Sequence, residues 1–452
     1  MSARGRCSEP GARTVQRTAT VGGPPWQLPV ALLCAAAIAQ VAGAGALLVA
    51  APELAAGVAY GPAQLGTAHL LGLAFLTVAI FGALLQLVPV LLRRPLGTPV
   101  RWAAAGASLA GGSWALAIGL WTDRGAAIAT GGTLVVLGGA IVVGDLAVAL
   151  AGAAREGNLG ASGAGIAAAA VWLAVVMALG ALMAANRVDP FLDVDRLRLI
   201  GAHSAVALVG WIGGTILAVA QRLAPMFALS HGYRRGPGIA ALVLWHASVA
   251  PIAIGLGLGI APLAAAGAIC LLCACALAGW FTAGVARHRR RSPEAPLVHL
   301  SLGIACAAAA CCLMLAAWAG AGDPYRLAIP ATLLALVGTG AGITSGHLFK
   351  VVPMLVWTGR YAHMAGTPGA PKLTDLYPGP LAIAEQAAFA AGLALLVAGT
   401  AAGSADAARA GAALLIAGAV AVLAAVGVCV LGRPGATRPA PGLTPHTTGE
   451  PA

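Results

Sequence analysis

The chain has 452 residues, of which 60% are hydrophobic and only 9% are charged. Soluble globular domains carry far more charge, so the composition excludes a soluble protein. The formal net charge of +12 lies mainly in short loops beside apolar runs. That distribution is typical of membrane topology and argues against a nucleic-acid partner.

Apolar runs long enough to cross a bilayer, about 20 residues each, repeat along nearly the whole chain. They predict an all-α polytopic membrane protein of about twelve transmembrane helices, surrounded by the lipid bilayer. The expected spans are 27–50, 63–92, 101–121, 126–151, 163–186, 199–228, 237–259, 262–286, 297–319, 327–357, 380–401 and 409–432. Residues 1–26 are interpreted as an N-terminal arm, 27–432 as the membrane domain and 433–452 as a disordered tail. The loop 358–379 is expected to pack on the bundle.

Basic residues precede the first span and follow the even-numbered spans, which puts them on one side of the membrane if the helices alternate. The positive-inside rule makes that side cytoplasmic and predicts two cytoplasmic termini in a bacterial inner membrane. These residues are Arg4, Arg6, Arg13, Arg17, Arg93, Arg94, Arg101, Arg234, Arg235, Arg287, Arg289, Arg290, Arg291, Arg360, Lys372, Arg433 and Arg438.

Three spans end in the same way, with a long polar side chain, two apolar residues, a proline and two more apolar residues. The three endings are 86–91, 222–227 and 350–355. Upstream of the first two lies a histidine, His69 or His203. Repetition inside a membrane domain indicates a pseudo-symmetric bundle with its site near the axis.

Histidines inside the spans are the candidate ligands, since a polar group in lipid needs a reason. His69 and His203 lie at matching depth between small residues, and neutral imidazole binds haem iron and copper well. His246 is a further candidate metal ligand. Each of these residues could instead hydrogen-bond across helices. His347 and Lys350, one turn apart, could bind an anionic group such as a haem propionate, or Lys350 could extend to the interface.

Other polar residues in the spans are expected to be structural. His299 is predicted at the cytoplasmic interface. Asp145 and Glu385 lie near helix ends, so hydration or pairing with arginine is expected, with a proton relay as the alternative. The nine cysteines favour helix contacts over a disulfide framework or a metal site.

Over residues 60–360 the pattern resembles subunit I of the haem-copper oxidase superfamily, most closely its C-type branch. The resemblance implies three four-helix units in a pseudo-threefold bundle, with ligands from the second, sixth, seventh and tenth helices. It implies His69 as a low-spin haem ligand and His203 as a copper ligand. The adjacent histidine pair of the seventh helix and the His-x-His of the tenth helix are missing here.

We therefore expect a divergent, oxidase-like protein that binds b-type haem or a metal ion, copper included. Electron transfer, redox sensing or chemistry on a diatomic gas are its expected roles, with an electron donor or a partner subunit. Whether it is an oxidoreductase stays open, because the missing ligands argue against conventional oxygen reduction. The alternative is a cofactor-free permease or assembly factor on the same fold, with Arg222, His347 and Lys350 lining a pore or an anion site.

Overall fold

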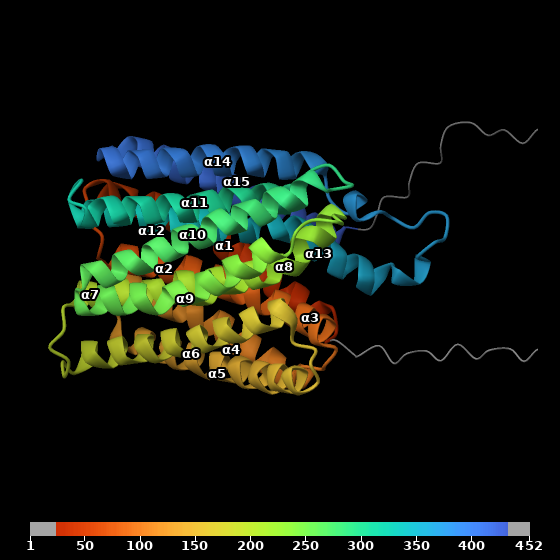
Figure 1. The fold of residues 1–452 in the computed structure, drawn as a ribbon, viewed down its shortest axis with the longest axis horizontal. Coiled ribbons are helices and arrows are strands. Elements are labelled where there is room, and N and C mark those ends of the chain that lie inside the picture. Colours follow the sequence, from red (N-terminus) through yellow and green to blue (C-terminus); the bar gives the residue numbers. More distant parts are fainter. Residues whose placement is uncertain (1–23, 433–452) are drawn as a thin grey trace, which may run out of the picture.

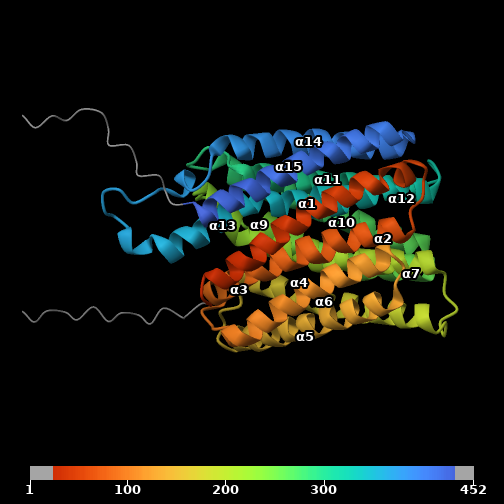
Figure 2. The ribbon, with the colours of Figure 1, turned by 180° about the vertical axis from the view of Figure 1, so that it is seen from behind.

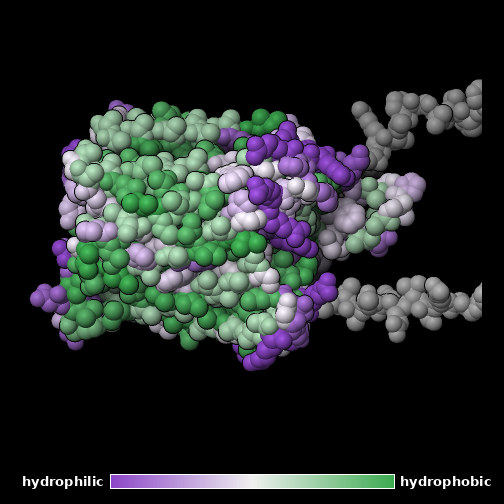
Figure 3. All heavy atoms as spheres, in the orientation of Figure 1, coloured by the Kyte–Doolittle hydropathy of each residue, from purple (hydrophilic) through white to green (hydrophobic). Residues whose placement is uncertain are grey.

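The structure is a computed structural model that describes residues 24–432. Nearly all of the predicted N-terminal arm and the whole predicted tail lie outside these residues. Within 24–432 the protein is all-helical, and twelve helices are long and apolar enough to cross a membrane. The prediction of twelve spans is confirmed, with ends that differ from the expected ones by five residues or fewer. An apolar flank with hydrophilic residues at both ends is visible in Figure 3.

The helices fall into three consecutive units of four spans each. The first comprises α1 (Gln27–Ala55), α2 (Pro62–His69), η1 (Leu70–Thr77), α3 (Val78–Leu92), α4 (Pro99–Trp121) and α5 (Gly125–Arg155). The second comprises α6 (Gly160–Val188), α7 (Arg196–Ala205), η2 (Val206–Gly213), α8 (Gly214–Ala228), α9 (Gly236–Leu258) and α10 (Ala261–Arg287). The third comprises α11 (Ala295–Trp318), α12 (Pro324–Leu333), η3 (Leu334–Ala341), α13 (Gly342–Arg360), η4 (Ala362–Met364), η5 (Leu373–Asp375), α14 (Gly379–Ala402) and α15 (Ala405–Leu431).

The three units pack in the same way. In each, the last two helices form a hairpin, and the last helix of one unit contacts the first helix of the next. The ring closes because α15 packs on α1, as Figure 2 shows. In Figure 1, α14 of the third unit lies at the top of the view and α5 of the first unit at the bottom, with α9 of the second unit between them. The repeated sequence endings thus belong to a repeated arrangement of helices.

The second span of each unit forms the inside of the bundle and contains a π-helical segment. Its apolar window is 61–78% buried, against 28–56% for the other nine spans. From Leu70 to Pro89, from Val206 to Pro225 and from Leu334 to Pro353, each π segment begins 19 residues before the proline of the repeated ending. The segments η1, η2 and η3 contact one another pairwise. π-helical segments are rare in proteins, and those that occur often lie at functional sites.

A second repeat sets the close approach of the outer hairpins. Small residues recur at spacings of seven and twelve: Gly112, Gly119 and Gly131; Ser248, Gly255 and Gly267; Gly392, Gly399 and Gly411. At every glycine of these triplets, a Cβ would meet backbone atoms of the partner helix at 3 Å or less. Small residues let membrane helices approach this closely, so van der Waals packing holds the hairpins together.

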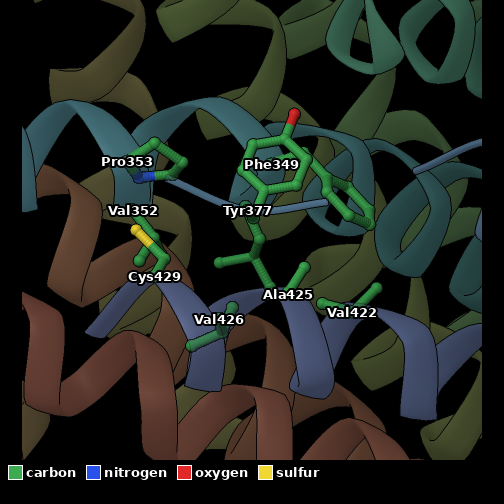
Figure 4. Close-up of a pocket in the computed structure, with 9 residues that line it drawn as sticks. Phe349, Val352, Pro353, Tyr377, Val422, Ala425, Val426 and Cys429 are labelled. Atoms are coloured by element: carbon green, nitrogen blue, oxygen red, sulfur yellow. The ribbon is translucent and has the colours of Figure 1, made fainter. Parts of the chain in front are cut away.

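The loop that follows α13 packs on the bundle, as expected from the sequence. The Trp357 indole donates to the carbonyl of Pro371 at 2.6 Å, and Tyr377 lies over Phe349. Burial raises the pKa of the Tyr377 phenol. Figure 4 shows the hollow that Tyr377 closes between α13 and α15. This hollow leaves no room for a water molecule, so it is a packing feature and not a ligand site.

Candidate functional site

His69 and His203 come from different units and lie together inside the bundle. His69 is the last residue of α2, and His203 lies in α7, three residues before η2. Their ring centroids are 6.2 Å apart, and the ring planes differ by 26°. Both side chains are half-buried. Matching depth in the sequence therefore corresponds to proximity in space, which the repeat alone did not require.

The surroundings of the pair leave ring nitrogens available. His69 Nδ1 bonds the carbonyl of Leu65 at 2.8 Å, which directs the ring and leaves Nε2 for another partner. His203 Nδ1 is buried and has no hydrogen-bond partner among the described residues. The Cε1 edge of His203 faces Gly180 of α6, where a Cβ would lie 3.3 Å away. Both imidazoles therefore have a ring nitrogen that no described residue bonds, in an apolar setting.

A polar bridge joins the same two units beyond the pair, at the end away from the basic loops. The Arg196 guanidinium donates to the Tyr60 hydroxyl at 3.1 Å and lies over its ring at 5.9 Å. Arg196 begins α7, and Tyr60 comes just before α2. The bridge therefore fixes the ends of the two helices that carry His69 and His203.

His246 lies in α9 and packs against the start of α8. A Cβ on Gly214 would be 3.2 Å from His246 Nδ1. Neither ring nitrogen has a hydrogen-bond partner within residues 24–432. In that same range, no group of three or more His, Cys, Asp or Glu side chains is close enough to hold a metal ion. Metal ligation by His246 stays a prediction.

His347 and Lys350 are engaged in separate contacts. His347 Nδ1 bonds the carbonyl of Ile343 at 2.7 Å, and its ring lies 6.1 Å from that of Phe227. Lys350 is buried, and its amino group pairs with Glu294 at 2.5 Å. Glu294 lies just before α11 and its side chain is 30% exposed, so Lys350 extends toward that end of the bundle, as one of the two expected alternatives has it. Binding of an anionic group by these residues stays a prediction.

The structure corrects the interpretation of His299 and Glu385. His299 Nε2 lies 2.8 Å from Glu385 Oε2, with side chains that are 1% and 0% exposed. The depth of His299 along the chain indicated an interfacial residue, but α13 covers its inner side. Glu385 pairs with this histidine and not with water or arginine. Asp145 does pair with an arginine, Arg101, at 2.8 Å, as expected.

The cysteines and the groove between α11, α12 and α14 offer no further candidate site. All eight cysteines in the described part of the chain are free. A groove of about 370 Å³ between α11, α12 and α14 is lined by apolar side chains throughout. No protein-family model and no curated protein matches the sequence. The site is therefore interpreted from its residues and their geometry.

Proposed function

We propose that this protein is a redox protein of the membrane in which His69 and His203 together hold one metal centre. A b-type haem is the first candidate and a copper ion the second. The observation that supports the proposal is the 6.2 Å separation of the two imidazole rings. Bonds from histidine nitrogen to a metal such as zinc are about 2.0–2.1 Å long, so rings this close together could each give a nitrogen to one metal ion.

The residues present fit such a group. The bond from His69 Nδ1 to the Leu65 carbonyl is the contact that commonly orients a metal-binding imidazole. Gly180 leaves the edge of the His203 ring uncrowded. A bound haem or copper ion would supply one-electron chemistry. The chain itself contributes a dry setting, two neutral donors and two helices whose ends are joined by Arg196 and Tyr60.

The oxidase resemblance gave the two histidines to different cofactors, His69 to a haem and His203 to copper. Their proximity favours one shared centre. If one haem took a nitrogen from both residues, the chain would offer it two histidine ligands, which favours electron transfer or redox sensing over gas chemistry. The substrate class is then an electron donor and an electron acceptor, each a separate molecule or partner subunit.

We also propose that the arginine-rich end of the bundle faces the cytoplasm of a bacterial inner membrane. This end carries the residues that follow α3, α8 and α10: Arg93, Arg94, Arg234, Arg235, Arg289, Arg290 and Arg291. The opposite loops balance their arginines with acids, as in the pair of Arg187 with Asp123. An excess of basic residues in short loops sets this orientation.

The test is an absorption spectrum of the purified protein, oxidised and reduced, with iron and copper quantified in the same sample. His69→Ala and His203→Ala are each expected to lose the metal and the reduced band. His246→Ala is the matched control, because its ring lies against Gly214 and is not part of the pair. It is expected to keep both.

A colourless, metal-free and folded wild-type protein would refute the proposal. The permease alternative would then be tested by uptake assays on Arg222→Ala and Lys350→Ala. Loss of metal in His246→Ala, with His203→Ala unaffected, would overturn the shared pair and favour a different ligand set.

A further inference from the structure

The His299–Glu385 pair is the most deeply buried titratable group outside the candidate metal site. The 2.8 Å bond joins α11 to α14. His299 Nδ1 and Glu385 Oε1 are also buried, and neither has a hydrogen-bond partner among the described residues. A buried polar atom without a partner costs free energy, so each of these two atoms has capacity for a further hydrogen bond.

Glycines of α13 hold the imidazole in place. A Cβ at Gly346 would lie 2.7 Å from His299 Cβ, and one at Gly342 would lie 3.6 Å from His299 Nδ1. Beside Gly342, the Phe389 ring packs edge-on against the imidazole, with its centroid 5.2 Å from that of His299. The histidine is therefore enclosed by Gly342 and Gly346 of α13 and by Phe389 of α14.

Charge counting fixes how many protons the pair holds. A deprotonated pair would leave one negative charge in a low-dielectric interior, and a doubly protonated pair would leave one positive charge. Counted beyond the N–H proton of the neutral imidazole, only the state with one proton on the pair has no net charge. No other charge compensates it within the described residues: Lys350 of α13 pairs with Glu294, and His347 turns to Phe227. Gln386 of α14 bonds its own helix, and α15 has Asp406 and Arg409 only in its first turns.

An ionic pair, Lys350 with Glu294, lies nearer the arginine-rich end than His299 and Glu385 do. Glu294 is five residues before His299 on α11, and Lys350 is four residues after Gly346 on α13. At 1.5 Å of rise per residue, Glu294 and Lys350 lie about 6–8 Å nearer the arginine-rich end than His299 and Gly346 do, along the seam where α11 contacts α13. The Glu294 side chain is 30% exposed, so the seam begins in contact with solvent.

We propose that His299 and Glu385 form a binding site for one proton, with Glu385 as the protonated carboxylic acid. The site exchanges this proton with the arginine-rich face through Glu294 and Lys350. The neutral acid donates to His299 Nε2, and the exchange passes a proton in and a proton out, so no net charge enters the interior. The site does not depend on any cofactor, and metal-free protein should retain it.

The experiment is infrared spectroscopy of the purified protein in H₂O and after transfer to D₂O, which reports the C=O stretch of carboxylic acids. Wild type should show a band that shifts in D₂O and is absent in Glu385→Gln. Asp145→Asn is the matched control: Asp145 is also a buried carboxyl near the same end, but it pairs with Arg101 as a carboxylate. That variant should keep the band.

The route is tested with the double variant Glu294→Gln/Lys350→Met, which removes both charges of the outer pair together. It should keep the Glu385 band and slow its shift in D₂O. Absence from the wild type of a band that Glu385→Gln removes would overturn the protonated acid. A band that does not shift over many hours would show a fixed hydrogen bond between helices, and an unchanged rate in the double variant would overturn the route.

Discussion

Gly411→Ala should loosen the hairpin between α14 and α15, because the added methyl group has no space. A Cβ at Gly411 would lie 2.7 Å from the carbonyl oxygen of Gly392 and 2.8 Å from Leu396 Cα. These are backbone atoms of α14, which cannot rotate out of the way as a side chain does. The two helices must therefore separate along their whole contact.

The size of the effect follows from two opposing terms. Overpacking of a tight contact costs about 1–3 kcal/mol. Replacing glycine by alanine inside a helix contributes about 0.5–1 kcal/mol in the favourable direction. Gly427→Ala is the matched control, because it lies in the same helix with open space around its Cβ position. It should be neutral or stabilising, and Gly411→Ala should be less stable than it by about 1–3 kcal/mol.

The assay is unfolding of both variants in mixed detergent micelles by titration with a denaturing detergent, followed by tryptophan fluorescence. Equal free energies of unfolding for the two variants would refute the close approach of α14 and α15. Gly131 is the equivalent position of the first unit. A Gly131→Ala variant as stable as the control would refute the threefold repeat of this contact.

Two further predictions concern the arginine-rich end. The hydrogen bond from Arg94 lowers the pKa of Glu156, so its stabilising effect is present above the ordinary carboxyl pKa and is lost as the pH falls through the lowered value. Wild type should then be slightly more stable than Glu156→Gln at neutral pH, and the two should converge in acid; a constant difference would contradict this. A reporter domain that works only in the cytoplasm should be active when it is fused to the C-terminus, and one that works only outside the cytoplasm should be inactive. Activity of the second reporter alone would reverse the proposed orientation.

The sequence determined the number and extent of the spans. Apolar length is a local property, since every stretch that crosses a bilayer must be about 20 apolar residues long whatever its neighbours are. The repeated proline endings, an internal comparison of the chain with itself, likewise indicated a repeated bundle. The pairing of Asp145 with an arginine was predictable because basic residues are plentiful at that end.

Only the tertiary structure decided which polar residues meet. The depth of a residue along a helix says nothing about the direction in which its side chain faces. His299 was placed at the right depth, yet it is enclosed by α13 and α14 and paired with Glu385. For Lys350 the sequence left open the interface or an anionic ligand, and only the structure showed that its partner is Glu294.

At the candidate site, too, the sequence indicated the residues and the tertiary structure decided that they are neighbours. His69 and His203 occupy similar positions in two repeats, but similar positions in a ring of units can be adjacent or far apart. The π segments and the tight hairpins bring these two helices together at the axis, and their contacts depend on residues more than one hundred positions apart in the chain. Hydrophobicity acts on each segment alone and fixes what enters the membrane, whereas packing acts between segments and fixes which side chains become neighbours.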